Sequence, residues 1–136
     1  MDPGIEMTVD ELKDYNKNSV FLLLNAYNNN VFAFGGNVYQ SDEVSRSNIS
    51  GTSTMALLLL QRGSDFPANF TWRSADNQDI PMTAVDVLNM GATLFSFIST
   101  NYLNSFHHKT LIDNLTTVQE LIDYDITTGW QGTLPW

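Results

Sequence analysis

Two stretches of the chain share one pattern, and together they restrict its fold more than any other feature. Each has a short β-rich arm, a turn rich in Gly, Asn or Asp, a second arm and then a helix-start signal. The first covers residues 31–44 and the second covers residues 70–83. Turn residues of these types supply the positive φ angles that tight hairpins need. We therefore expect two short β-hairpins, each leading into a helix.

The helices on either side of the first hairpin have recognisable ends. A capping box of Thr8 and Glu11 opens the first helix, which the asparagine run 28–30 ends. The second opens at residue 41 or 42, reaches about residue 62 and carries small or polar residues where a core face is expected. Its early half therefore either approaches another element very closely or is irregular, and we favour a helix with a weak point near Gly51.

The longest expected helix follows the second hairpin and is capped by Thr83. Apolar residues recur along it at helical spacing and make a nearly unbroken stripe: Val85, Leu88, Ala92, Phe95, Ile98, Tyr102 and Phe106. A further capping box, Thr117 with Glu120, opens a short final helix through about Asp125. The end of the chain contains two Gly and a Pro, so we expect it to be extended.

These elements predict an α+β fold. Two short β-hairpins form a small antiparallel sheet, which packs against three main helices plus a short C-terminal helix. We assign residues 1–128 to a single α+β domain and residues 129–136 to an extended, tryptophan-containing C-terminal tail. With 136 residues, of which 43% are hydrophobic, the chain is long and apolar enough for one buried core.

Composition excludes several classes of partner and chemistry. Six basic and 15 acidic residues give a net charge of −9, and the bases form no stripe, which excludes DNA and RNA as direct partners. An anionic membrane is disfavoured too, and the longest apolar runs are too short to span a bilayer. The absence of cysteine excludes disulfides, thiolate catalysis and zinc fingers. The acidic N-terminus lacks the order of an export signal, so we expect none.

No motif indicates catalysis, a cofactor or a metal site. His107 and His108 are adjacent, so on a helix they point about 100° apart and cannot chelate one metal as an i, i+4 pair does. We expect them to face solvent or to cap a helix end. Asp123 and Asp125 weakly resemble a calcium loop, but its glycine falls one place late and its twelfth position is Leu134 rather than Glu. We therefore predict a protein that is not an enzyme.

The tryptophans divide into two groups. Trp72 lies on an alternating strand, so we expect it to anchor the sheet or the core. Trp130 and Trp136 lie in the tail without any periodicity, and such rings must bury on this domain or on a neighbouring protein. Both alternatives stay open, and we take Trp130, Leu134 and Trp136 as candidate partner-docking residues.

A series of short motifs, in order and at matching spacing, resembles a small domain common in bacteriophage genomes. The motifs are Phe34-x-Gly36, Val38-Tyr-Gln-Ser-Asp, Ser47-Asn-Ile, Trp72-x-x-x-Asp76-Asn77, Ile80-Pro-Met, the long helix, and Thr117-x-x-Glu-Leu-Ile-Asp-x-Asp-Ile before Trp130. The similarity covers roughly residues 12–130. That domain has no assigned activity and is often found in or beside tail-fibre and fibre-assembly proteins.

The resemblance implies a non-enzymatic bacteriophage structural protein, a component of the tail, tail fibre or baseplate that acts through protein–protein docking. Its expected partners are other phage tail or fibre proteins within an oligomeric assembly. Its expected location is the virion, after synthesis in the host cytoplasm. The alternative is a tail-fibre assembly chaperone that binds the fibre transiently and is absent from the mature virion. A small hydrolase of host surface sugars is a third class, and it would need a pair of pocketed carboxylates.

Overall fold

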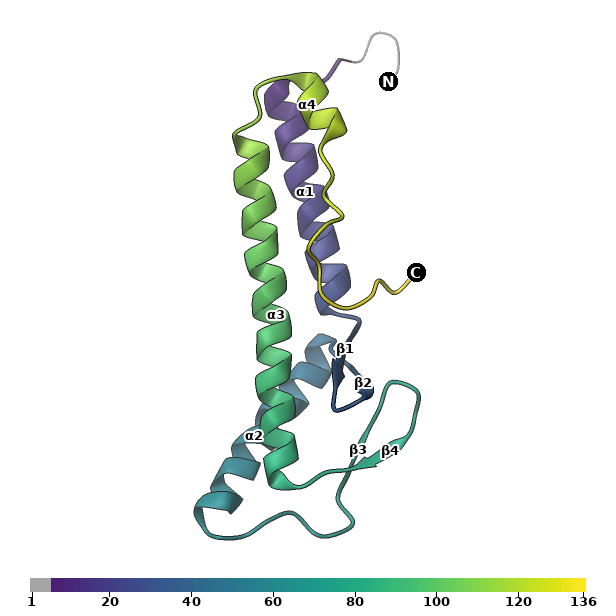
Figure 1. The fold of residues 1–136 in the computed structure, drawn as a ribbon, viewed down its shortest axis with the longest axis vertical. Helices are drawn as coiled ribbons and strands as arrows, with labels where there is room; N and C mark the ends of the chain where they lie inside the picture. The colour runs from purple at the N-terminus through teal and green to yellow at the C-terminus, as the bar shows by residue number, and fades with distance from the viewer. Residues whose placement is uncertain (1–5) are drawn as a thin grey trace.

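A computed structural model describes residues 6–136, and their elements follow the expected order (Figure 1). The elements are α1 (Val9–Asn28), β1 (Val31–Phe34), β2 (Asn37–Gln40), α2 (Glu43–Gln61), β3 (Thr71–Arg73), β4 (Asp79–Pro81), α3 (Ala84–Asp113) and α4 (Val118–Asp123). The α+β class, with three main helices and a short C-terminal one, is confirmed. The expectation about an export signal rests mainly on residues 1–5, which lie outside the described residues.

The molecule is a rod built on α3, which runs along most of its length (Figure 1). With 30 residues, α3 is about 45 Å long. α1 lies antiparallel beside the C-terminal half of α3, while α2 packs against the N-terminal half. Both hairpins lie beside the N-terminal half as well, and the last segment of the chain runs back along α1 (Figure 1).

The two hairpins form separate sheets. β1 pairs with β2 in one antiparallel sheet and β3 pairs with β4 in another, so the expected single sheet is divided into two. The first turn depends on Gly35 and Gly36, whose φ angles of 58° and 82° are those that a two-residue hairpin needs. In the second turn Asn77 takes a positive φ of 62°, which asparagine tolerates better than most residues do.

The expected helix starts are confirmed. The Thr8 side chain accepts a hydrogen bond from the Glu11 backbone in a complete capping box, and Thr83 with Asp86 forms a second one. α2 continues through Gly51 without a break. The small residues of α2 serve a close approach instead, because a Cβ atom added at Gly91 of α3 would lie 2.5 Å from Ser53 Oγ. Of the two alternatives for this part of α2, a close approach to another element is therefore the correct one, and an irregular segment is not.

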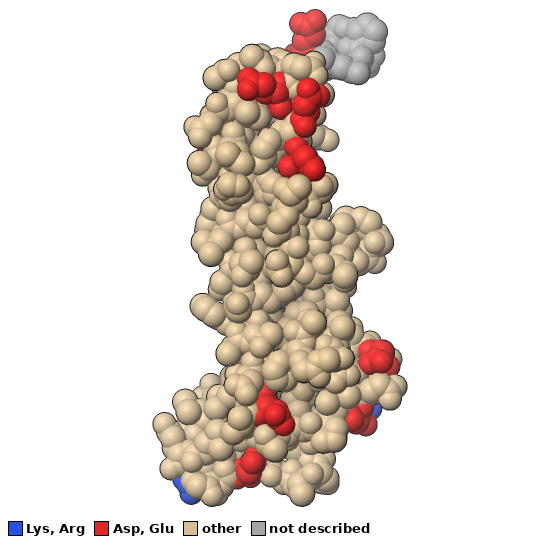
Figure 2. All heavy atoms as spheres, in the orientation of Figure 1, with Lys and Arg blue, Asp and Glu red and all other residues tan. Residues whose placement is uncertain are grey.

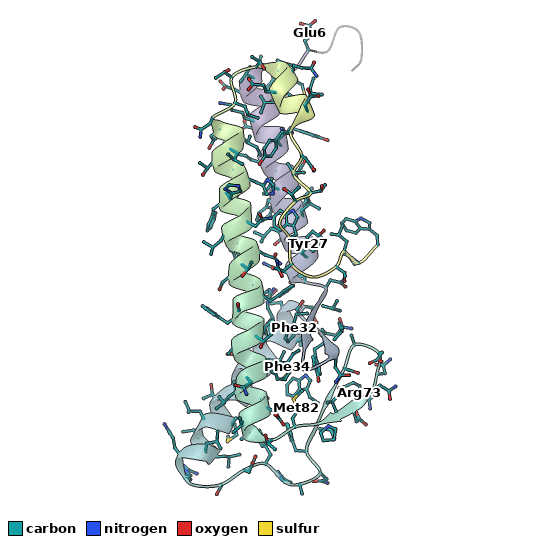
Figure 3. The ribbon with its side chains drawn as sticks, viewed as in Figure 1. Glu6, Tyr27, Phe32, Phe34, Arg73 and Met82 are labelled. Carbon is teal, nitrogen blue, oxygen red and sulfur yellow. The ribbon has the colours of Figure 1, made fainter. Side chains whose placement is uncertain are left out.

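Two apolar cores occupy the two ends of the rod. The larger lies where the first hairpin, α2 and the N-terminal half of α3 meet, and Figure 3 shows Phe32, Phe34 and Met82 gathered there. Trp72 packs against this core partly buried, as an anchor of the second hairpin. The smaller core joins α1, the end of α3 and α4 through Leu12, Val20, Ile112 and Leu121. Between the two cores, α3 turns polar side chains inward: Asn101, Ser105 and His108.

Candidate functional site

Most of the apolar stripe of α3 faces outward, while Leu88 and Ile98 are half-buried and pack against the larger core. Amphipathic helices usually bury such a stripe in the core. Here Phe95 is 75% exposed, Phe106 is 55% exposed and Tyr102 is 46% exposed. We call the stripe formed by Leu88, Ala92, Phe95, Tyr102 and Phe106 the outer face. Contiguous exposed apolar surface of this kind marks interaction sites on soluble proteins.

The inward polar side of α3 binds the end of the chain. Residues 124–133, which we call the strap, run in an extended course beside α1 and α3. The amide of Asn101 donates hydrogen bonds to Asn28 Oδ1 (2.9 Å) and to the Gln131 carbonyl oxygen (3.2 Å), and it accepts one from the Gln131 N–H (2.7 Å). Asn104 donates to the Thr128 carbonyl oxygen (2.9 Å). The polar face therefore satisfies strap backbone groups that a purely apolar helix would leave unpaired.

His108 corrects the expectation of a solvent-facing or capping pair. His107 is exposed, but His108 is only 2% exposed and binds the strap through both ring nitrogens. Nδ1 lies 2.6 Å from the Tyr124 hydroxyl and Nε2 lies 2.8 Å from the Thr128 carbonyl oxygen. Since a carbonyl can only accept, Nε2 carries the proton and donates it, which leaves Nδ1 to accept from Tyr124. Burial raises the pKa of Tyr124, so this phenol keeps the proton that it donates.

Trp130 packs within this chain. Its ring stacks on Tyr27 of α1 with ring centroids 5.6 Å apart and on His108 of α3 with centroids 5.8 Å apart. Its Nε1 donates to the Ile126 carbonyl oxygen at 2.8 Å, a hydrogen bond between two residues of the strap. Figure 3 shows Tyr27 beside the strap. This places Trp130 in the intramolecular alternative, so it no longer belongs among the candidate docking residues.

The chain beyond the strap projects from the rod. Asn30 donates to the Thr133 carbonyl oxygen at 3.0 Å, which is the last hydrogen bond between the strap and the rest of the chain. Leu134 is half-buried, while Trp136 is 81% exposed. Trp136 therefore remains available to a partner. The expected boundary at residue 129 falls inside the strap, because residues on both sides of it bind α3.

A shallow groove of about 470 Å³ joins the outer face to α2. Its α3 wall is mainly apolar and includes Leu88, Phe95 and Ile98, whereas its α2 wall combines small hydroxyl side chains with Leu57 and the charged Arg46. Gly91 also lines this groove, at the point where α2 and α3 approach each other closely. It widens the apolar surface of the outer face toward α2.

Charge is concentrated at the two ends of the rod. On the side seen in Figure 2, acidic residues gather at both ends and the middle carries none. Near the end that contains α4, Lys17 pairs with Asp113 at 2.9 Å, and this contact lowers the pKa of the Asp113 carboxyl. Along α3 itself, no residue from Leu88 to Phe106 is Asp, Glu, Lys or Arg. The outer face is thus electrically neutral on a chain of net charge −9.

The acidic residues near α4 have local hydrogen-bonding roles. The Asp125 carboxylate accepts from the Thr127 N–H (2.9 Å) and hydroxyl (2.5 Å), and these bonds lower its pKa. Within residues 6–136, no group of three or more His, Cys, Asp or Glu side chains is arranged to hold a metal ion. None of the helices in this described part has the length and apolar character needed to cross a membrane.

Comparison with known proteins identifies one family. A domain of unknown function (DUF4376) matches residues 22–128, which is well over half of the chain. The chain therefore belongs to the DUF4376 family. No curated protein and no solved structure is significantly similar to it.

Proposed function

We propose that this member of the DUF4376 family is a non-enzymatic structural subunit of a bacteriophage tail, tail fibre or baseplate, and that it acts by docking to other proteins. The assignment to a phage rests on the sequence motifs described above. The docking role is supported chiefly by one observation, the exposure of the apolar stripe on α3. Leaving large apolar rings in water costs free energy that burial against a partner recovers, at about 25 cal/mol per Å².

Two surfaces serve this role. The outer face is supported on a rigid helix whose opposite side is held by both cores and by the strap, so it is presented without rearrangement. The second surface is the end of the chain, where Trp136 projects beyond the last strap hydrogen bond. Tryptophan is enriched among residues that dominate binding energies, which supports Trp136, with Leu134 beside it, as a docking residue.

Quantitative mass spectrometry of purified phage particles tests this function. We expect the chain in a fixed stoichiometry to other tail proteins. Its absence from mature particles would refute the structural role. If it were absent from particles and instead co-purified with unassembled fibre protein, the assembly-chaperone alternative would replace this proposal.

A pair of variants links the test to the outer face. Phe95→Asp places a charge in the middle of that face, and we expect it to reduce incorporation into particles at least tenfold, since burying an unpaired charge costs several kcal/mol. Val44→Asp is the matched control, because Val44 is similarly exposed but lies on α2 outside the outer face. Equal incorporation of both variants would show that the outer face is not the docking surface.

A further inference from the structure

The outer side of α3 has the residue spacing of a coiled-coil seam. Steps of three and four residues alternate without interruption along one line of the helix: Val85, Leu88, Ala92, Phe95, Ser99, Tyr102 and Phe106. All of these positions except Ser99 are apolar. A seam of this period is what two helices need in order to pack side by side with interlocking side chains.

The order of large and small residues suits a reversed copy of the same helix. If two copies of α3 pack antiparallel with their centre at position 97, Phe95 faces Ser99 of the second copy. In the next layer Tyr102 faces Ala92. Each of these two aromatic rings thus meets a small residue that leaves room for it, and in the layer beyond them Leu88 faces Phe106. A parallel pair would set Phe95 against Phe95 and Ala92 against Ala92, which overfills one layer and leaves another poorly packed.

We propose that the outer face is the interface of an antiparallel homodimer in which α3 of one copy packs against α3 of a second copy. This deepens the proposed function by naming the occupant of the docking surface, and it leaves Trp136 for a different protein of the assembly. The pairing is isologous, so each residue contact occurs twice about a two-fold axis and the assembly closes at two copies.

The charge distribution favours a second copy over a basic partner. Each copy has a net charge of −9, so self-association requires an interface away from the acidic residues. The stretch from Leu88 to Phe106 meets this condition, because it carries no charged side chain. A basic partner would instead be attracted to the acidic ends of the rod, since complementary charges guide association.

The seam of α3 supplies nearly half of the area of a standard interface. The seam from Val85 to Phe106 is about 32 Å long, and a helix with its side chains is about 10–12 Å wide. α3 alone therefore offers roughly 350 Å² of projected surface. The groove wall on α2, with Leu57 about half exposed, widens this surface on one side. Near the C-terminal end of α3, the Lys17–Asp113 contact holds one side of α1 next to the seam. This side of α1 also carries the exposed Phe21, one helical turn after Lys17. A standard interface buries roughly 800 Å² per partner, so these flanking surfaces have to supply the remainder.

Single cysteines test the pairing, because the natural chain contains none. The full chain is prepared as Ala92→Cys and, separately, as Tyr102→Cys, and the two variants are mixed and oxidised. In the antiparallel pair these positions face each other, so we expect disulfide-linked dimers from the mixture. Each variant alone should give few, because its two cysteines lie about 15 Å apart along the axis, beyond the roughly 7 Å between Cα atoms that a disulfide tolerates.

Each other outcome overturns part of the proposal. Efficient linkage of Ala92→Cys alone would indicate a parallel pair. Absence of linkage in every sample, repeated with Phe95→Cys and Ser99→Cys in case a first variant fails to fold, would show that a second copy does not occupy the face. This failure is separable from that of the proposed function, since a monomeric chain that is present in particles refutes only the dimer. A dimer that is absent from particles refutes only the structural role.

Discussion

Replacing Trp130 by alanine should destabilise the folded chain, because this ring connects the strap to both long helices. Its stacking contacts with Tyr27 and His108 and its hydrogen bond to the Ile126 carbonyl oxygen all disappear in the variant. Truncating a core tryptophan costs about 3–5 kcal/mol. Since Trp130 is only partly buried, we place its cost at the lower end, near 3 kcal/mol, which lowers the melting temperature of a domain of this size by about 10 °C.

Thermal unfolding followed by circular dichroism measures this effect, with Trp136→Ala as the matched control. Trp136 is 81% exposed, so its removal should change the free energy of unfolding by no more than about 0.5 kcal/mol. If Trp130→Ala melted within about 2 °C of the unaltered chain, the intramolecular role of the ring would be refuted. If Trp136→Ala were the more destabilising of the two, the assignment of one ring to the fold and the other to a partner would have to be reversed.

Two further expectations concern α3 and its neighbours. Gly51→Ala, with open space around it, should stabilise by about 0.5–1 kcal/mol. Gly91→Ala should stabilise less or destabilise, because its new Cβ meets Ser53 Oγ at 2.5 Å and the Ser53 hydroxyl has to turn away from the Val87 carbonyl oxygen. Urea unfolding measures both, and a gain at Gly91 equal to that at Gly51 would contradict the close helix approach. Lys17→Met should lower the melting temperature near neutral pH but not near pH 2. Lys17 lowers the pKa of Asp113, so the stabilisation is present above the ordinary carboxyl pKa and is lost as pH falls through the lowered one. An equal fall in melting temperature at both pH values would show that the loss of the Lys17–Asp113 pair does not cause the destabilisation.

Local signals in the sequence were sufficient for the secondary structure. The capping boxes at Thr8 and Thr83 depend only on side chains three residues apart, so helix starts could be predicted without knowledge of the fold. The first hairpin followed from Gly35 and Gly36 for the same reason. The division of the hairpins into two sheets could not be predicted, because it depends on how distant segments pack around α3.

The periodicity of the sequence could not predict which side of α3 faces the core and which side faces outward. A helical stripe shows that one side of a helix is apolar, but not whether this side meets the core or a partner. A second signal was present in the sequence: Asn101, Ser105 and His108 also follow steps of four and three residues, on the opposite side of the same helix. Polar residues at helical spacing usually face solvent. Here Asn101 and His108 face inward because the strap, further along the chain, supplies their hydrogen-bond partners, while Ser105 donates to the Tyr102 carbonyl oxygen of its own helix.

The same long-range contact explains His108 and Trp130. Neither residue had a partner that the sequence could reveal. Tyr27, on which Trp130 stacks, lies at the end of α1, far from it along the chain. Thr128, to which His108 donates, is separated from His108 by irregular chain. Folding brings them together at the middle of the rod. The docking surface predicted at the tail is accordingly reduced to its last residues, and the outer face of α3 becomes the principal candidate.

The native mass of the purified chain, measured by sedimentation equilibrium, tests most directly whether the outer face binds a second copy. We expect the unaltered chain to sediment at twice its 15.3 kDa at micromolar concentrations, and Phe95→Asp to sediment at 15.3 kDa while keeping its helical circular dichroism spectrum. An unaltered chain that remains at 15.3 kDa up to about 100 µM, a range in which even weak specific pairs associate, would contradict the homodimer.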